Sequence, residues 1–181
     1  MIRTIVAIGL VLAGTALAGR AAQEEPVISV TEGDGRYAVA ARFSVPESPA
    51  LVREVLTDYA EIPRFMPDVR RSVIVQRTEQ RVRVEQEAVA KYMMFSKKVH
   101  LLLDVEEGDQ VIAFRDLCNR SFQRYDGSWT LRPEGGGTRI EYQLSAQPAF
   151  SVPGFVLRKL LNRDAVVMVE RLRTEIRARS R

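Results

Sequence analysis

Histidine and cysteine are almost absent from this chain. Its 181 residues include one histidine, His100, and one cysteine, Cys118. A zinc site built from paired histidines or from Cys-x-x-Cys motifs is therefore excluded, and so is an internal disulfide. The GxSxG, HExxH and Walker phosphate-loop motifs are also missing, so the sequence carries no catalytic signature of these kinds. We expect neither a catalytic constellation of a known type nor a resident metal or cofactor.

A large excess of charge of one sign is missing as well. The 27 lysines and arginines stand against 23 aspartates and glutamates, which gives a formal net charge of +4. This mild excess does not form the strongly basic footprint that nucleic-acid binding requires, so no nucleic-acid partner is expected. The length and the 46% hydrophobic content are typical of one globular domain.

Long hydrophobic runs are confined to the N-terminus. The uncharged stretch from Thr4 to Gly19 is shorter than the about 20 residues that a membrane-spanning helix needs. It closes with Ala16-Leu17-Ala18, the small-residue pattern that a signal peptidase cleaves. We therefore predict a signal peptide over 1–18 and export of the mature chain to the periplasm. Behind it we expect an N-terminal segment, 19–35, with one extra strand, and the main domain over 36–181.

Alternation of apolar and polar residues predicts a sheet with one dry and one wet face. The expected strands are 27–31, 36–45, 69–77, 81–90, 97–105, 110–117, 122–131 and 138–146. A helical period replaces the alternation from Phe155 to about Arg179. Strands followed by one long helix indicate an α+β architecture.

The stretch from Val45 to Val75 predicts two short helices between strands. Ser48 is a typical N-cap with Pro49 in the first turn, and Asp58 with Glu61 repeats a capping signature. Two prolines, at 63 and 67, should end the second helix within about a turn.

The motif VLTDYAEIPRFMPDVRRS, which begins at Val55, resembles the SRPBCC or START-like superfamily. In particular, it resembles the polyketide cyclase/dehydrase branch, which includes the coenzyme-Q-binding proteins. The resemblance runs from about Arg36 to Arg179. It implies a helix-grip fold: a curved antiparallel sheet wraps a long C-terminal helix, two short helices follow the first main strand, and a hydrophobic cavity lies between sheet and helix.

Eleven residues are our candidates for lining this cavity. They are Phe65, Met66, Val84, Gln86, Ala88, Phe114, Arg115, Trp129, Tyr142, Leu161 and Met168. Gln86 interrupts an apolar strand face, so its amide needs either a ligand or a neighbour such as Tyr142. Arg115 either points inward to an acidic or carbonyl ligand or forms an outward salt bridge. Phe65 and Met66 either gate the cavity or pack in the core.

The leading functional hypothesis is an exported protein that binds a lipid, an isoprenoid or a polyketide-like molecule. The first alternative is an aromatase/cyclase or dehydratase in which Tyr142, Arg115 and Gln86 act on a substrate. The second is a protein-interaction module of the cell envelope. A bound lipid would support the binding protein, and catalytic turnover would support the enzyme. An interior filled by side chains would support the interaction module.

Basic residues dominate the end of the chain. From Leu157 to Arg181 there are eight lysines and arginines against three acidic residues. Arginines near a helix C-terminus complement the helix dipole. Alternatively, they make transient contact with an anionic membrane surface.

Overall fold

The computed structural model of the chain describes residues 25–92 and 94–181. The predicted signal peptide, 1–18, lies outside these residues, so its cleavage stays a prediction. In the part that is described, no helix combines the length and hydrophobicity that a membrane crossing requires.

Eight strands and a small set of helices make up the described chain. In order they are β1 (Val27–Gly33), β2 (Arg36–Val45), α1 (Pro49–Thr57), the 3-10 turn η1 (Tyr59–Glu61), α2 (Ile62–Phe65), β3 (Val69–Arg77), β4 (Arg81–Tyr92), β5 (Phe95–Glu107), β6 (Val111–Asp116), β7 (Phe122–Glu134), β8 (Gly137–Pro148) and α3 (Gly154–Arg179). The order agrees with the α+β prediction, and most strands run a few residues beyond their expected ends.

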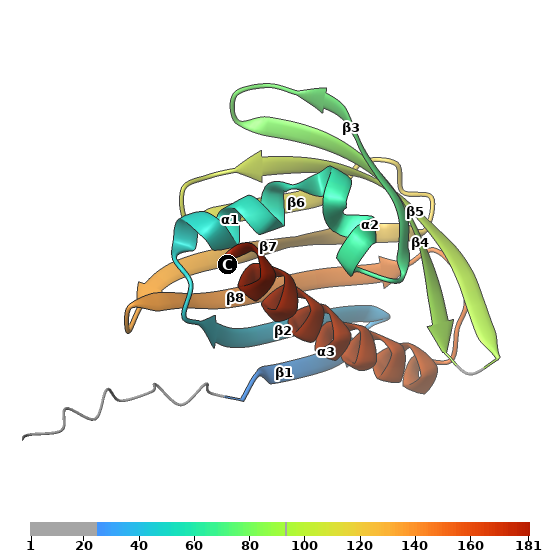
Figure 1. The fold of residues 1–181 in the computed structure, drawn as a ribbon. Helices are drawn as coiled ribbons and strands as arrows, with labels where there is room; N and C mark the ends of the chain where they lie inside the picture. The colour runs from blue at the N-terminus through green and yellow to red at the C-terminus, as the bar shows by residue number, and fades with distance from the viewer. Residues whose placement is uncertain (1–24, 93) are drawn as a thin grey trace, which may run out of the picture.

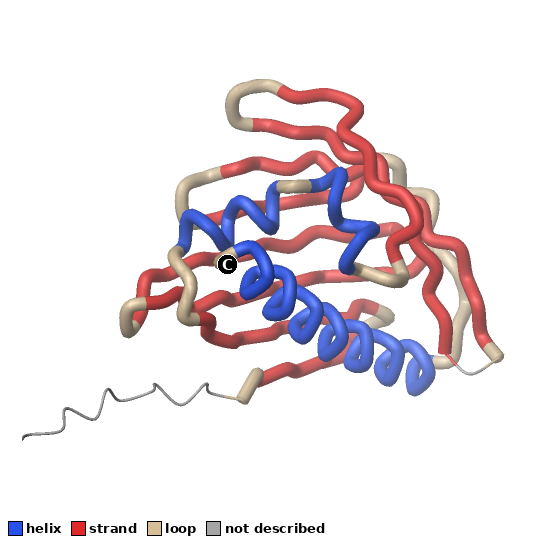
Figure 2. The backbone as a smooth tube through the Cα atoms, viewed as in Figure 1, coloured by secondary structure: helices blue, strands red, loops and turns tan. Residues whose placement is uncertain are grey.

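All eight strands form one antiparallel sheet in the order β1-β2-β8-β7-β6-β5-β4-β3. The sheet is strongly curved, and the helices lie on its concave side (Figure 1). Figure 2 shows that α3 crosses this hollow, with α1 and α2 beside it. This is the predicted helix-grip architecture. The strands β1 and β3 form the two edges of the sheet.

The strand β2 illustrates how the sequence pattern produces the curved sheet's two faces. Successive side chains of a strand point to opposite faces, so alternate residues share one environment. Tyr37, Val39, Ala41, Phe43 and Val45 are each at most 5% exposed, whereas the residues between them are mostly exposed. Burial of this row fixes the register of β2, because a one-residue slip would turn every apolar side chain outward.

The helix α1 begins as the sequence predicts. The Ser48 side chain accepts a hydrogen bond from the Leu51 amide, and Pro49 occupies the first turn. The second predicted cap is wrong, because the Asp58 side chain caps nothing. Its carboxylate instead accepts a hydrogen bond from Arg179 Nη1 at 2.8 Å, so an ion pair to the end of α3 replaces the local cap.

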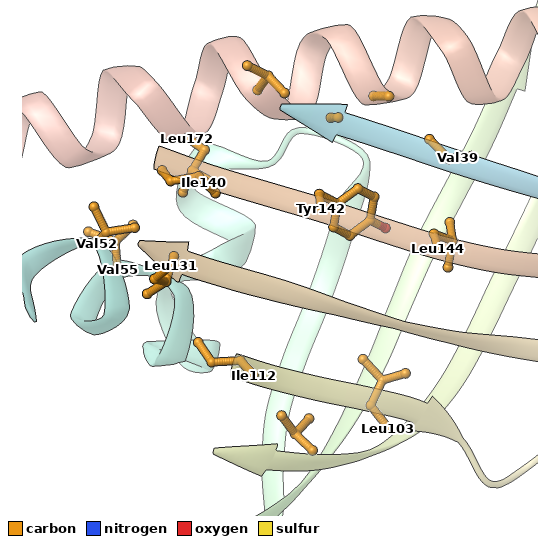
Figure 3. Close-up of a cluster of buried hydrophobic side chains, with 14 of the residues drawn as sticks. Val39, Val52, Val55, Leu103, Ile112, Leu131, Ile140, Tyr142, Leu144 and Leu172 are labelled. Carbon is orange, nitrogen blue, oxygen red and sulfur yellow. The ribbon is translucent and has the colours of Figure 1, made fainter. Parts of the chain in front are cut away.

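The densest part of the core lies where α1 and the C-terminal half of α3 meet the sheet. Figure 3 shows Val52 and Val55 of α1, Leu172 of α3 and Ile140 of β8 in one cluster. All four are at most 1% exposed. Burying such side chains contributes about 1.5–3 kcal/mol each, so this end of the molecule anchors α3 on the sheet.

A buried ion-pair network joins α3 to the α1–α2 segment. Glu175 is only 5% exposed, and its Oε1 accepts hydrogen bonds from Arg179 Nε at 2.8 Å and from Arg64 Nη2 of α2. Arg179 also reaches Asp58, and Arg64 reaches Glu61 at 2.9 Å. The network therefore fixes both ends of the η1–α2 segment, which borders the candidate site described below.

Replacing Glu175 with glutamine should lower the free energy of unfolding by about 2–3 kcal/mol. The cost of removing one member of a buried ion pair is about 3–5 kcal/mol, and exposure of the Arg64 side chain reduces it here. Urea denaturation measures the change. Glu170→Gln on the exposed side of the same helix is the control and should be neutral. Equal behaviour of the two variants would contradict a stabilising network.

Candidate functional site

An internal cavity of about 350 Å³ lies between the concave sheet face and the helices. Its wall consists mainly of aliphatic and aromatic side chains from α1, α2, α3 and seven strands. Among them are Val39, Leu56, Tyr59, Ile62, Phe65, Met66, Gln86, Ala88, Ala90, Leu101, Leu103, Phe114, Phe122, Tyr125, Trp129, Tyr142, Leu144, Phe150, Leu157, Leu161, Asp164, Ala165, Met168 and Leu172. The volume falls at the lower end of the about 300–1,000 Å³ that small-molecule sites occupy.

Side chains along the inner stripe of α3 differ in how completely they are buried. Leu172 and Ile176, in the C-terminal half, are at most 1% exposed. Leu161 and Met168 lie on the same stripe but are only half-buried, and both line the cavity. Small side chains opposite them, such as Ala88 of β4, leave space that the helix does not fill.

The sheet side of the cavity is aromatic. The rings of Trp129 and Tyr142 lie 4.4 Å apart between centroids, and those of Phe122 and Tyr125 lie 4.9 Å apart. Phe114 bridges the two pairs, 6.3 Å from Tyr142 and 6.0 Å from Tyr125. Centroid separations of about 4.5–7 Å are favourable for aromatic pairs, so these five rings form a connected wall. The part of the wall that α3 contributes is mainly aliphatic by contrast.

Among the described residues that line the cavity, Gln86 is the one with a side-chain amide. Its Nε2 donates a hydrogen bond to Ser72 Oγ of the neighbouring β3 at 3.1 Å. The Gln86 amide is therefore hydrogen-bonded to a neighbouring side chain, which is Ser72 rather than Tyr142. In the described part of the chain, this is the one hydrogen bond of the Gln86 side chain, and it leaves the amide oxygen and the second N–H without a partner there.

Two tyrosine hydroxyls lie in the interior. Burial raises the pKa of Tyr125 to about 12, and a hydrogen bond from Tyr142 partly opposes this rise. Burial also raises the pKa of Tyr142 well above its usual value, and the adjacent Tyr125 adds to the rise. Both phenols therefore keep their protons at neutral pH, where they serve as hydrogen-bond donors rather than as general bases.

Titration of the tyrosines should be displaced to high pH in the folded protein. Burial also raises the pKa values of Tyr37 and Tyr59, beside Glu32 and Glu107 respectively. A free tyrosine has a pKa of about 10. Raised values mean that the folded state holds protons that the unfolded state has lost. Stability should thus be complete below about pH 10 and fall as the pH rises above it.

Absorbance of phenolate at 295 nm, followed from pH 8 to 12.5, measures this displacement. We expect most of the tyrosine signal to appear above about pH 11, together with loss of secondary structure. Ionisation of all five tyrosines of the chain near pH 10 in a folded protein would contradict the burial of these hydroxyls.

Nine of the eleven sequence-predicted residues line the cavity. They are Phe65, Met66, Gln86, Ala88, Phe114, Trp129, Tyr142, Leu161 and Met168. Their shared position does not test ligand binding, which stays a prediction. Val84 lies on the same sheet face but in the filled core, where it is 0% exposed and borders no space.

Arg115 does not face the cavity. Its side chain is on the convex face of the sheet, 61% exposed, and Nη2 is 3.1 Å from Asp104 Oδ2. Asp104 is 7% exposed and also pairs with Arg81 at 3.0 Å. The outward alternative for Arg115 is therefore the observed one. An inward guanidinium would have to leave this carboxylate for an apolar interior, at a high desolvation cost.

The sequence reasoning missed several lining residues, of which Asp68, Tyr125 and Asp164 carry polar groups. Asp68 lies within the quoted motif, and Asp164 lies one turn from both Leu161 and Met168 on the helix. The helical spacing was a usable signal for Asp164. The alternation along the strand was a usable signal for Tyr125, which lies four residues before Trp129 and therefore on the same face.

The convex face of the sheet carries a second hollow, a trough of about 620 Å³. Small and polar side chains such as Ser29, Ala38, Ser128 and Gln143 line it, with Asp104 and Arg115 at the charged end. It lacks the apolar wall of the cavity. Among residues 25–92 and 94–181, no group of three or more His, Cys, Asp or Glu side chains could hold a metal ion.

A curved antiparallel sheet that closes around a long C-terminal helix, with an apolar cavity between them, defines the helix-grip class of proteins. The family described as polyketide cyclase/dehydrase and lipid transport matches residues 45–173. The chain belongs to this family. The match covers the short helices, seven of the eight strands at least in part, and most of α3.

Solved structures share the fold. The protein TTHA0849 of Thermus thermophilus is 27% identical, with a TM-score of 0.69 over 80% of this chain and 99% of that one. A STAR-related lipid transfer protein of Xanthomonas axonopodis is 17% identical, with a TM-score of 0.66 over 83% and 98%. The Zhui aromatase/cyclase of Streptomyces sp. R1128 is 16% identical, with a TM-score of 0.68 over 81% and 96%. No curated protein matches the chain.

Proposed function

We propose that this protein is an exported carrier that binds a hydrophobic small molecule in the cavity between the sheet and α3. The observation that supports the proposal is the unfilled space of about 350 Å³ behind an aromatic and aliphatic wall. An empty apolar cavity costs stability, because its lining side chains lose contacts on one side. A ligand that fills it recovers this energy, whereas a protein-interaction module gains nothing from the space.

The ligand class is a lipid or isoprenoid, with quinones and polyketide-like molecules among the candidates. Support comes from the family, whose description includes lipid transport, and from the relative of the same fold that is titled a lipid transfer protein. Apolar contact supplies most of the affinity at such a site, and a few polar groups set the ligand's orientation. Gln86, Tyr125 and Tyr142 are the groups of this kind.

Native mass spectrometry of gently purified protein tests the carrier function. We expect an adduct whose extraction yields an apolar small molecule, and uptake of an apolar fluorophore by the stripped protein. Ligand-free protein that also takes up no apolar fluorophore would contradict it.

A cyclase or dehydratase is the second candidate, since the phenols of Tyr125 and Tyr142 carry protons into the cavity. Arg115, one of the residues first assigned to this role, lies on the other face of the sheet. Turnover of a poly-keto substrate that Tyr142→Phe abolishes would favour the enzyme over the carrier.

Export and membrane contact complete the proposal. Export rests on the predicted signal peptide, and an N-terminus at or near Gly19 in exported protein would support it, whereas retained Met1 would contradict it.

For membrane contact, Phe155 at the start of α3 is 66% exposed, close to the exposed Lys159. Several arginines of α3, including Arg158 and Arg179, are engaged in ion pairs within the protein. We therefore expect the start of α3 to contact an anionic surface, which sedimentation with vesicles rich in phosphatidylglycerol measures.

A further inference from the structure

Charged groups in the cavity wall are of one sign. Among the described lining residues the charged side chains are Asp68, before β3, and Asp164, on α3, and no lysine, arginine or histidine lines the cavity. This differs from the protein as a whole, in which basic residues outnumber acidic ones. We call Asp68 and Asp164 the acidic pair.

The acidic pair sits where the α2–β3 connection approaches α3. The Asp68 carbonyl accepts a hydrogen bond from the Val89 amide of β4 at 2.8 Å, which fixes this connection against the sheet. Asp164 is half-buried, and burial and the nearby Asp68 charge both raise the pKa of its carboxyl. The two carboxylates therefore face a shared, partly desolvated region at the cavity wall.

Two basic side chains lie beside the wall without forming part of it. Arg163 Nη2 is 2.6 Å from Asp164 Oδ1 and is thereby already occupied. Lys97 Nζ lies 5.1 Å from the centre of the Phe150 ring, and Phe150 also lines the cavity. Neither places a positive charge in the cavity wall.

The remaining polar groups of the wall are uncharged, and they include the phenols of Tyr125 and Tyr142, which keep their protons at neutral pH. Gln86 Nε2 donates one N–H to Ser72, which leaves its second N–H and its oxygen for a ligand. The Tyr59 hydroxyl donates to Glu107 Oε1 at 2.8 Å and is not a free donor. An anionic head group would thus lose its hydration, meet the Asp68 carboxylate and an Asp164 already paired with Arg163, and gain no free counter-ion in the wall, a combination that disfavours its binding.

We propose that the cavity selects amphiphiles whose polar end is uncharged or cationic and donates hydrogen bonds, such as an alcohol or amine, and discriminates against carboxylates, sulfonates and phosphates. The acidic pair and the Gln86 oxygen would accept hydrogen bonds from this end, while the apolar part lies against the aromatic wall. The inference rests on the proposed function, because it concerns the ligand of that same cavity.

Two fluorophores with the same ring system test it. N-phenyl-1-naphthylamine is neutral, and 1-anilinonaphthalene-8-sulfonate adds one sulfonate to that framework. We expect saturable binding of the neutral probe and at least tenfold weaker binding of the sulfonate at pH 7.5. 1-Dodecanol and dodecylamine should displace the neutral probe, and dodecanoate should not.

The variant Asp68→Asn/Asp164→Asn removes the acidic charge with little change of shape. It should raise the affinity of the sulfonate probe relative to that of the neutral probe at least threefold. Glu87→Gln/Glu170→Gln, which neutralises two exposed carboxylates on β4 and α3, is the matched control and should alter neither probe.

The outcomes separate this inference from the proposed function. If neither probe nor any dodecyl compound binds, the carrier function itself fails. If the sulfonate or dodecanoate binds as tightly as the neutral compounds and displaces them, the carrier stands and the selectivity for uncharged or cationic heads is overturned. Loss of that anion binding in Lys97→Gln would then identify Lys97 as the counter-ion.

Discussion

Replacing Ala88 with phenylalanine should abolish binding of an apolar ligand and leave the melting temperature nearly unchanged. Ala88 lines the cavity opposite α3, so the new ring enters space that no side chain occupies. The ligand loses this space, while the fold loses no contact and gains some apolar burial. Titration with N-phenyl-1-naphthylamine and thermal denaturation measure the two effects side by side.

Two alanines of β2 provide the controls. Ala41 is 3% exposed in the filled core, so Ala41→Phe should overpack it and destabilise the protein by about 1–3 kcal/mol or more. Ala40 is exposed on the other face, so Ala40→Phe should change neither binding nor stability. If Ala88→Phe behaves like Ala41→Phe, the region beside Ala88 is packed and the carrier function is contradicted.

Truncating Ile176 should cost far more stability than truncating Met168, although both lie on the inner stripe of α3. Ile176 is 0% exposed and does not line the cavity, and a buried Ile→Ala change costs about 2–5 kcal/mol. Met168 borders the cavity and already lacks neighbours on one side. Met168→Ala also gains helix propensity, so we expect a loss of about 1 kcal/mol or less.

Urea denaturation at one temperature compares these two variants directly. Ligand affinity provides the second comparison: Met168→Ala should alter it, because the side chain belongs to the cavity wall, and Ile176→Ala should alter it less. Equal losses of stability would mean that α3 is packed evenly along its length, against the proposed site.

Local patterns were sufficient for the elements and their order. The cap at Ser48, the alternation along β2 and the helical period of α3 each depend on residues within a turn or two of one another. The motif at Val55 then indicated the fold, and the family match over residues 45–173 supports it. The Asp58 cap was wrong because a distant residue, Arg179, supplied a charged partner that no local pattern contains.

The sequence by itself determined which residues face inward: Gln86, Ala88, Trp129, Tyr142, Leu161 and Met168 follow from strand and helix periods. Only the tertiary structure decided which of these inward residues meet empty space. Val84 and Ile176 obey the same periods as Ala88 and Met168, yet Val84 and Ile176 are fully packed, whereas Ala88 and Met168 border the cavity. The reason is physical: periodicity assigns a side chain to a face, whereas a cavity depends on the distance between two faces. That distance depends on the curvature of the sheet and on where Leu172, Glu175 and Ile176 anchor α3. Both are set by contacts between residues far apart in the sequence, which only folding brings together.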